Sequence, residues 1–586
     1  MRTEPVSSLP DNWPVMSIEQ ANALLTAPGA VFEMEELSIH GSPVNVYKNA
    51  PASLRDLFEA GSTGFADKTL MVFQDERVSF AAHRKAVRKL AEVLKTQFGL
   101  RQGDRVAISM RNYPQWSVGF WACLISGYIA TPLNSWWTGE ELEYGLSDSG
   151  AKVAIVDDEI FSRIAPHWQN LPNLEQVIVA RGEGNYTDDR VHSMEQFIGA
   201  APQWESLELV DAPEIDLKPE DEATIMYSSG TTGKPKGILA THRAIIANMF
   251  NSMANQVRAL LRRGETPPEP NPEDPQKATL VSIPLFHATG SFAILSPCFI
   301  TGNKIVTMYK WDATEALGII EREKITAFGG VPAIAWQVLE HPDRDKYDLS
   351  SIEAVSYGGA PSAPELVATI KRRFKDAVAG NGWGMTETCA TATLNLAEDY
   401  VNRPESAGAP APAVELKVVD TDGKTLPPNE IGELWCKSPS NAKCYWNRPE
   451  STAETFKDGW VVTGDLARID EDGFLYLVDR AKDMLIRGGE NIYCIEVESA
   501  LYDHPDITDA AVVGIPHKVL GEEVGAVVQV KDGSTLTLEP LQAFLKEHLA
   551  GFKIPVRVEF QSEPLPRNAN GKILKAEIRE RFSQPA

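Results

Sequence analysis

Cysteine is scarce in this chain, and its few copies follow no recognisable arrangement. The 586 residues contain six cysteines, at positions 123, 298, 389, 436, 444 and 494. They form neither a C-x-x-C pair nor a cluster with histidine at zinc spacing, which argues against a zinc site and against a disulfide scaffold. We therefore expect free thiols and a reducing compartment, the cytoplasm.

Basic residues are also in deficit. Lysine and arginine together number 56, against 81 aspartates and glutamates, which gives a net charge of -25. An acidic excess of this size repels phosphate polymers and anionic lipid surfaces, so nucleic acid is not an expected partner. The first residues also lack a basic segment followed by an apolar core, so neither a secretory signal nor a transit peptide is expected.

A membrane span is the next feature to exclude. Residues 112–139 carry no charge, and the apolar stretch 116–133 (WSVGFWACLISGYIATPL) approaches the length that crosses a bilayer. However, Pro114 and Pro132 bracket this stretch, and small and polar residues dilute it. The sequence therefore predicts a buried crossover helix and no transmembrane segment.

The pattern that is present alternates strand-like and helix-length segments. Apolar runs such as RVAISM (105–110) and KVAIVD (152–157) form a first set, and runs such as NKIVTM (303–308) and IEAVSYGGAP (352–361) form a second. Near-continuous apolar strands separated by helices are typical of parallel βαβ units. From about residue 410, short strands with Asp-Gly turns predict an antiparallel region instead.

These patterns predict an α/β fold with several parts. We expect a large N-terminal domain, residues 1–481, with two βαβ-type subdomains and a small β-rich subdomain. A small α+β C-terminal domain, residues 482–586, is expected to follow. Residues 263–277 (RGETPPEPNPEDPQK) concentrate proline and acid, so we predict a mobile, solvated insertion there.

Residues 227–237, YSSGTTGKPKG, form the most informative stretch, which we name the signature loop. Its glycines allow close approach of the backbone to an anion, and its hydroxyls and two lysines supply donors and positive charge. It does not match the P-loop, because Ser228 stands where the first glycine is required and Pro235 follows Lys234. A surface turn with solvated lysines is the alternative for a shorter match.

The signature loop resembles that of the adenylate-forming superfamily, which includes acyl-CoA synthetases, adenylation domains of nonribosomal peptide synthesis and firefly-type luciferases. Further motifs follow in the family's order from about Ser53 to Arg581. They are SYGGAP (356–361), NGWGMTET (381–388), WVVTGDL (460–466), DRAKDMLIRGGENI (479–492) and PRNANGK (566–572). The resemblance implies that a carboxylate attacks the α-phosphate of ATP, releasing pyrophosphate, and that a thiol then displaces AMP.

The resemblance also implies a nucleotide site with ATP, Mg²⁺ and CoA as cofactors. The residues assigned to ATP are Ser228, Ser229, Gly230, Thr231, Thr232, Gly233, Lys234, Lys236, Gly359, Ala360, Pro361, Asn381, Gly382, Trp383, Gly384, Met385, Thr386, Asp465, Arg480 and Lys572. Thr386 would bind the α-phosphate and Glu387 would bind Mg²⁺, whereas Glu387 alone reads as a helix-start carboxylate.

Three further assignments have ordinary alternatives. Trp383 would stack on adenine, although a core tryptophan is equally compatible with the sequence. Asp465 would accept the ribose hydroxyls with help from Arg480, but could be a turn cap, with Asp479 and Arg480 forming a surface ion pair. Lys572 would neutralise charge during adenylation, whereas its local sequence reads as a solvated hairpin tip.

In the family the C-terminal domain is mobile and rotates between the two half-reactions. The pivot position falls on Lys482, and Gly488 and Gly489 would line the pantetheine tunnel. Together with Lys572 and Thr386, His287 is assigned a catalytic role, because its position in relatives borders the acyl pocket and gates thiol entry. A satisfied core histidine is the alternative for His287.

The acyl pocket follows from the same resemblance. Its predicted residues are His287, Ala288, Thr289, Phe292, Gly358 and Gly384. Acetate-specific relatives carry a tryptophan at the position of Gly384, so the expected substrate is longer than acetate: a medium- or long-chain fatty acid, or a ring-bearing acid. CoA is the favoured thiol. A carrier protein, a luciferase-like reaction and a homo-oligomer stay open.

Overall fold

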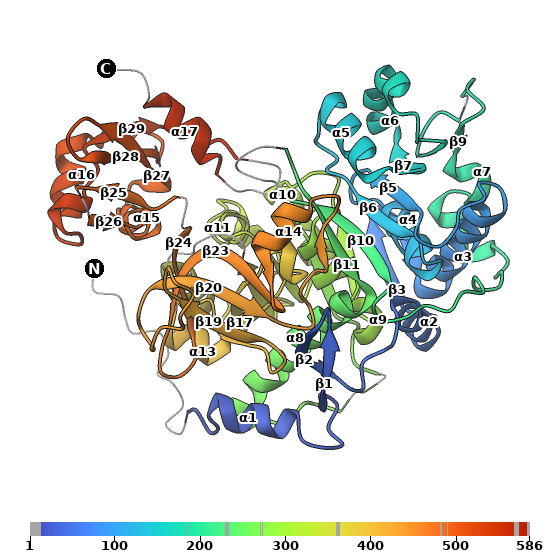
Figure 1. The fold of residues 1–586 in the computed structure, drawn as a ribbon, viewed down its shortest axis with the longest axis horizontal. Coiled ribbons are helices and arrows are strands. Elements are labelled where there is room, and N and C mark those ends of the chain that lie inside the picture. The colour runs from blue at the N-terminus through green and yellow to red at the C-terminus, as the bar shows by residue number, and fades with distance from the viewer. Residues whose placement is uncertain are drawn as a thin grey trace.

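The computed structural model describes residues 13–184, 186–228, 234–269, 271, 273–358, 364–480, 483–488, 490–567 and 573–582. These residues form a large body built on two mixed sheets, with a smaller module at its side (Figure 1). The module contains the C-terminal part of the chain, and a β-rich region precedes it in the sequence.

The first sheet contains the parallel strands that the first alternating segments predict. Its order is β21 (Cys444–Tyr445), β11 (Gly237–Thr241), β10 (Glu222–Tyr227), β6 (Ile129–Pro132), β5 (Arg105–Ser109), β7 (Val153–Asp157), β8 (Gln176–Ala180) and β9 (Val191–Ser193). Strands β11 and β21 are antiparallel additions at one edge. Between β5 and β6 lies helix α4 (Pro114–Ile125), in which every residue is buried. The uncharged stretch therefore contains a buried crossover helix, as predicted.

The second sheet is built from the second set of predicted strands and from five further strands that were not anticipated there. Its order is β18 (Ala409–Pro410), β17 (Thr393–Leu396), β16 (Val378–Trp383), β15 (Ala354–Gly358), β14 (Ala327–Gly330), β12 (Ala278–Val281), β13 (Lys304–Thr307), β3 (Thr69–Phe73) and β4 (Glu76–Ser79). The early strand β3 pairs in parallel with β13, far along the chain. The two sheets are therefore not consecutive in sequence.

Helices cover the sheets of the large body. Besides α4 they are α1 (Ile18–Leu25), α2 (Leu54–Gly64), α3 (Phe80–Thr96), α5 (Gly139–Ser149), α6 (Asp158–Ile164), α7 (Met194–Ile198), α8 (His242–Arg262), α9 (Cys298–Thr301), α10 (Ala313–Glu323), α11 (Pro332–Leu339), α12 (Pro364–Arg373), α13 (Ala397–Asn402) and α14 (Pro449–Thr455). A separate hairpin, β1 (Met34–Ile39) with β2 (Ser42–Tyr47), lies near α8. Within the described ranges, none of the helices combines the length and apolar character that a bilayer crossing requires.

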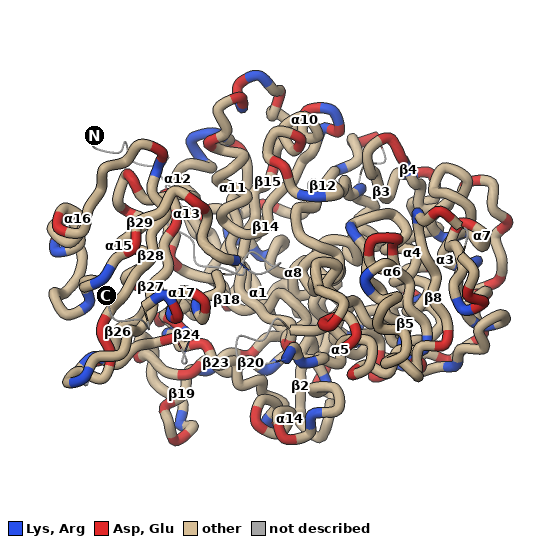
Figure 2. The backbone as a smooth tube through the Cα atoms, turned by 90° about the horizontal axis from the view of Figure 1, so that it is seen from above, with Lys and Arg blue, Asp and Glu red and all other residues tan. Residues whose placement is uncertain are grey.

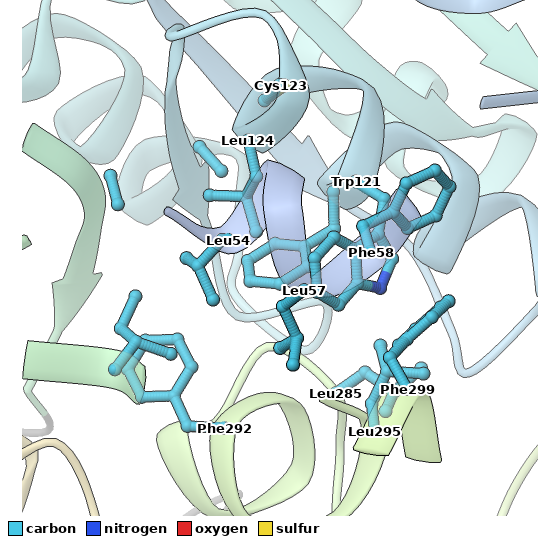
Figure 3. Close-up of a cluster of buried hydrophobic side chains, with 14 of the residues drawn as sticks. Leu54, Leu57, Phe58, Trp121, Cys123, Leu124, Leu285, Phe292, Leu295 and Phe299 are labelled. Atoms are coloured by element: carbon cyan, nitrogen blue, oxygen red, sulfur yellow. The ribbon is translucent and has the colours of Figure 1, made fainter. Parts of the chain in front are cut away.

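A shared aromatic core joins the two sheet units. The ring centroids of Phe58 on α2 and Trp121 on α4 are 5.2 Å apart, and Phe299 on α9 lies 4.5 Å from Trp121 (Figure 3). Helices α2 and α9 approach so closely that a side chain on Gly61 would collide with the backbone of Phe299. The cluster draws on segments of both units and so joins them, while each unit also has a buried cluster of its own.

The β-rich region is antiparallel, as its turn residues predict. It contains β19 (Glu415–Val419), β20 (Gly432–Lys437), β22 (Phe456–Lys457), β23 (Trp460–Ile469) and β24 (Leu475–Arg480). In the turn between β23 and β24, Gly473 has a φ of 83°, which glycine adopts without strain. This region carries the predicted ribose residue Asp465 on β23, directly opposite Arg480 on β24.

The C-terminal module is the α+β unit expected after the β-rich region. Its elements are β25 (Leu485–Arg487), β26 (Glu490–Ile492), α15 (Cys494–Tyr502), β27 (Ile507–His517), β28 (Gly521–Val530), α16 (Leu538–Leu545), β29 (Arg557–Gln561) and α17 (Lys575–Arg581). Its main core contains Val497, Leu501, Val524 and Val528, and every buried member of that core comes from residues after 484. An α/β fold with a small α+β module at the C-terminus is therefore confirmed.

Charged positions lie mainly at the outside of the fold. Figure 2 shows acidic and basic positions distributed around the periphery, while the middle of the large body is mostly uncharged. Among the described residues of the predicted insertion, positions 265–269 are exposed. Its ends are fastened, since Arg263 pairs with Glu398 and the Gln276 amide donates to the carbonyls of Thr69 and Gly302.

Candidate functional site

The signature loop connects two antiparallel neighbours, β10 and β11. Tyr227 ends β10 and pairs with Gly237, the first residue of β11. The backbone N-H of Ser228 donates to the carbonyl of Lys236 at 3.0 Å, which closes the base of the loop. Of the predicted loop residues, Ser229, Gly230, Thr231, Thr232 and Gly233 lie outside the described residues. The described part thus contains a closed base with Lys234 and Lys236 on one side.

Helix α5 holds both sides of this base. The Tyr227 hydroxyl donates to Asp148 Oδ2 at 2.9 Å, and the Tyr144 hydroxyl donates to the carbonyl of Pro235 at 2.8 Å. Arg448 pairs with the other oxygen of Asp148 at 2.6 Å. Burial, and then the Asp148 charge, raises the pKa of Tyr227, so its phenol remains a neutral donor. The sequence motifs gave no sign of this anchor.

A short turn after β16 presents the predicted phosphate and magnesium residues. The turn spans Thr386–Thr388, and Thr388 Oγ1 accepts from the backbone N-H of Met385 at 3.0 Å. Glu387 is only 7% exposed, and a buried carboxylate requires hydrogen-bond or ion-pair partners. The Tyr445 hydroxyl supplies one by donating to Glu387 Oε1 at 2.7 Å. Tyr445 was not singled out in the sequence; the aromatic pair in CYWNRPEST (444–452) was the available signal.

A pocket brings several predicted residues together at the base of the signature loop. Its lining comes from the ends of β6 and β10, from the segment after β12 and from the turn after β16. The lining residues are Pro132, Asn134, Trp137, Met226, Tyr227, Phe286, His287, Ala288 and Thr386. In open α/β sheets, ligands bind at the carboxyl ends of the strands, which is where this pocket lies.

The predicted acyl residues separate into two groups. His287 and Ala288 line the pocket, whereas Thr289 is exposed and does not. Phe292 is fully buried in the shared hydrophobic core (Figure 3), so its ring contributes to packing of the large body. The pocket is instead apolar through Trp137, Phe286 and Met226, which local sequence did not indicate.

Two predicted glycines have packing reasons for their size. A Cβ on Gly384 would lie 1.5 Å from the carbonyl oxygen of Ala390, closer than any real contact. A Cβ on Gly358 would lie 2.7 Å from the carbonyl of Gly382. Since the missing side chain of Gly384 faces backbone, its small size is required whatever acyl group binds.

Three predicted nucleotide residues form a hydrogen-bonded row. Trp383, at the end of β16, donates from Nε1 to Asp465 Oδ2 at 2.8 Å. Arg480 Nε lies 2.6 Å from Asp465 Oδ1, so both carboxylate oxygens have a protein partner. Trp383 is 6% exposed and packs in a cluster with Ala392 and Val414. It therefore occupies the core position that the sequence allowed as an alternative, while it also orients Asp465.

The surface pair considered for Asp479 and Arg480 is absent from these described residues. Arg480 pairs with Asp465, whereas Asp479 is 3% exposed and accepts from the backbone N-H groups of Arg480 and Cys494. Burial raises the pKa of Asp479 to about 6. Asp479 thus connects the last strand of the β-rich region to the first turn of α15 in the C-terminal module.

Several other assignments cannot be placed. Gly359, Ala360, Pro361, Lys482, Gly489 and Lys572 lie outside the described residues. Gly488 is described, with a φ of 60° and its N-H donating to the carbonyl of Leu520 at 2.8 Å. Its left-handed backbone gives a conformational reason for glycine at this position. Asn381 and Gly382 lie on β16, next to Trp383.

Comparison with known proteins gives matches along most of this chain. The family model for AMP-binding enzymes matches residues 58–446, and the model for the AMP-binding enzyme C-terminal domain matches residues 496–572. A long-chain-fatty-acid–CoA ligase from Bacillus subtilis (strain 168) is 33% identical over 550 residues, which cover 90% of this chain and 94% of that protein. A feruloyl-CoA synthase from Amycolatopsis sp is 35% identical over 506 residues, covering 86% and 94%.

A solved structure extends the similarity to the fold. The crystal structure of an anthranilate CoA ligase in complex with anthranoyl-AMP superimposes with a TM-score of 0.78 at 27% identity. The match covers 90% of this chain and 97% of that one. The likeness therefore includes the large body and extends into the C-terminal module.

Proposed function

The chain belongs to the AMP-binding enzyme family and is an AMP-forming acid–CoA ligase, and on this premise we propose the steps and residues of its reaction. A bulky carboxylic acid attacks the α-phosphate of ATP, pyrophosphate leaves, and CoA then takes the acyl group from the acyl-adenylate. Because both steps bring negative groups together, the protein's contribution is mainly positioning and charge stabilisation.

The observation that carries this proposal is the pocket at the base of the signature loop. It places Thr386 and His287 beside Tyr227, from which the loop begins. An acid bound against Phe286 and Ala288 would direct its carboxylate toward the phosphates held by the loop. In this assignment Thr386 binds the α-phosphate, and Ser228 to Lys236 bind the β- and γ-phosphates.

The donor set near Thr386 fits a magnesium ion held mainly by the nucleotide. Among the described residues, no group of three or more His, Cys, Asp or Glu side chains could hold a metal. Tyr445 binds one carboxylate oxygen of Glu387 and does not bind the other. A single carboxylate suits a magnesium ion that takes its remaining ligands from phosphates and water. When bound, Mg²⁺ would neutralise phosphate charge.

The adenosine would lie at the β-rich edge of the site. Asp465 would accept the ribose hydroxyls through lone pairs left after its contacts with Trp383 and Arg480. Gly359, Ala360 and Pro361 would approach the base from the other side, as the resemblance implies.

The nature of the acyl group is narrowed by the lining of the pocket. Trp137, Phe286 and Met226 favour an apolar or aromatic body for the acid. The places of Thr289, Phe292 and Gly384 in the acyl pocket stay predictions. The similar proteins include one named for long-chain fatty acids and one named for feruloyl-CoA. We propose a medium- or long-chain fatty acid as substrate, with an aryl acid as the alternative.

The second half-reaction requires the C-terminal domain, residues 482–586, to move relative to residues 1–481. Lys482 would act as the pivot, and Gly488 and Gly489 would line the path of the pantetheine. Lys572 would neutralise the reacting carboxylate and α-phosphate in the first step only.

We propose the cytoplasm as the location, since each of the six cysteines is a free thiol.

Exchange of radioactive pyrophosphate into ATP tests the first step across a panel of fatty and aryl acids. We expect exchange with bulky acids and none with acetate; acetate alone as substrate would contradict the proposed pocket. CoA and a phosphopantetheinylated carrier protein are then compared as thiols, and transfer to the carrier protein alone would replace CoA ligation.

The Lys572→Ala variant tests the division of labour between the steps. We expect it to abolish pyrophosphate exchange while preserving thioester formation from a preformed acyl-adenylate. Equal loss of both half-reactions would contradict the role given to Lys572.

A further inference from the structure

Tyr445 lies between two groups that the sequence motifs place far apart. It belongs to β21, the edge strand of the first sheet, where it pairs with Ile238 of β11. The residue is 8% exposed, and its hydroxyl donates to Glu387 Oε1 at 2.7 Å. A hydrogen bond to an ionised carboxylate is among the stronger kinds, so it restrains the rotation of the Glu387 side chain.

The ring of Tyr445 contacts the signature loop at the same time. Lys236 Nζ lies 4.9 Å from the ring centroid, within the range of a cation–π interaction. The same ammonium group donates to Ser451 Oγ at 3.1 Å. Tyr445 and Ser451 together therefore hold Lys236 at the end of the loop, and Tyr445 links Lys236 to Glu387.

The backbone around Tyr445 is fixed independently of its side chain. Its N-H donates to Thr452 Oγ1 at 3.0 Å, and the N-H of Ala442 donates to the carbonyl of Glu387 at 2.8 Å. Phe456 packs edge-on against the ring, with centroids 5.5 Å apart. The hydroxyl is thus delivered to Glu387 by a rigid frame, which is what an orienting donor requires.

The phenol is suited to remain a donor. A phenol carries its proton at neutral pH, so the Tyr445 hydroxyl is the donor and the Glu387 carboxylate is the acceptor of this bond. Its bond occupies Oε1 and leaves Oε2 of Glu387 for another ligand.

We propose that Tyr445 is a positioning residue for the metal–phosphate part of the site: its hydroxyl orients the Glu387 carboxylate, and its ring positions Lys236. The inference rests on the proposed function, because it takes Glu387 as a ligand of magnesium bound with ATP. Tyr445 itself touches neither the metal nor the phosphates in this account.

Calorimetric titration of the full-length protein with ATP, once with Mg²⁺ and once with excess EDTA, separates the two contacts. Tyr445→Phe keeps the ring and removes the hydroxyl, so we expect ATP affinity to fall about 10-fold or more with Mg²⁺ and to stay within about twofold in EDTA. Tyr445→Leu also removes the ring, so affinity in EDTA falls as well. Binding of Mn²⁺ with ATP, followed by electron paramagnetic resonance, reports the metal directly.

The matched control is Tyr476→Phe. Tyr476 also donates to a carboxylate, Asp470 Oδ2 at 3.2 Å, in the β-rich region. The substitution Tyr476→Phe makes the same chemical change. The affinity of this variant for ATP should stay within about twofold of the wild type under both conditions. A loss equal to that of Tyr445→Phe would mean that a general weakening of the fold explains the result.

Glu387→Gln separates failure of this inference from failure of the proposed function. If it loses the metal-dependent part of ATP binding and Tyr445→Phe does not, the positioning role is overturned while the role of Glu387 stands. If Glu387→Gln retains full metal dependence, the assignment of Glu387 itself fails, and the inference with it.

Thr452→Val provides a second route should Tyr445→Phe fail to fold. It removes the acceptor of the Tyr445 N-H and leaves the phenol in place. We expect a loss of ATP affinity of several-fold with Mg²⁺ and little change in EDTA. An unchanged affinity with Mg²⁺, or an equal loss in both titrations, would overturn the positioning role.

Discussion

Replacement of Trp383 by phenylalanine tests whether this side chain serves the adenine or the ribose. The indole N-H is 2.8 Å from Asp465 Oδ2, and both residues are buried. Phenylalanine retains an aromatic face for stacking but cannot donate this hydrogen bond. The change therefore separates the two roles that the sequence left open.

The size of the effect follows from the kind of bond that is lost. A buried hydrogen bond to a charged group contributes about 1.5 to 3 kcal/mol, which corresponds to about 10- to 100-fold in affinity. Arg480 still holds the other oxygen of Asp465 in the variant, so we expect the lower part of this range. The loss should appear only with ligands whose ribose hydroxyls bind Asp465.

The assay compares ATP with 2′,3′-dideoxy-ATP by calorimetric titration. In the wild type, the ratio of the two dissociation constants measures the ribose contacts. We expect Trp383→Phe to reduce this ratio about tenfold by weakening ATP while leaving the dideoxy nucleotide nearly unchanged. The smaller side chain also costs packing energy, but this cost is the same for both ligands and cancels in the ratio.

Asp465→Asn is the positive control, since it should bring the ratio close to one. If Trp383→Phe weakened both nucleotides equally, the indole would act on the base, and orientation of Asp465 would be refuted. A double variant should lose little beyond Asp465→Asn alone if the two residues act as a unit.

Two further predictions follow from buried positions near the site. Gly384→Ala should lower the thermal midpoint of unfolding, because the added Cβ would collide with the Ala390 carbonyl. Pyrophosphate exchange should fall with every acid. A stable variant that rejects only the largest acids would instead support a role in the acyl pocket. For Asp479, burial raises the pKa from 3.8 to about 6, so the folded state is penalised when the carboxylate is charged. The penalty is present above pH 6 and is relieved as the pH falls toward 4, by up to about 3 kcal/mol in total. Urea unfolding between pH 4 and 7 should therefore show a gain in stability on acidification that Asp479→Asn lacks, and parallel profiles would contradict this assignment.

The parallel strands of both sheets could be predicted because their information is local. Runs such as those that became β5 and β7 are apolar at almost every position, which is typical of strands covered on both faces. Which sheet a strand joins could not be predicted in the same way. Strand β3 pairs with β13, and nothing in residues 69–73 identifies a partner so far along the chain. Register between distant strands is decided by tertiary packing, which a single sequence does not reveal.

The site shows the same division. Motif residues such as Thr386 and Glu387 could be named from the resemblance, but Tyr445, the partner of Glu387, could not. Tyr445 approaches Glu387 only because β21 adds to the edge of the first sheet. Phe292 was assigned to the acyl pocket as an apolar residue, and the sequence did not reveal that its side chain packs in the core. Local spacing does not report which way a side chain faces in an irregular segment.

The order in which strands enter the two sheets has a consequence for synthesis of the protein. The second sheet includes β3 near the start of the chain and ends with β18 at Pro410, whereas the first sheet receives its edge strand, β21, from Cys444 and Tyr445. In a nascent chain, strands such as β3 therefore remain unpaired until much of the polypeptide has left the ribosome. The C-terminal module follows the large body in the chain and has its own core, so it can assemble without that delay.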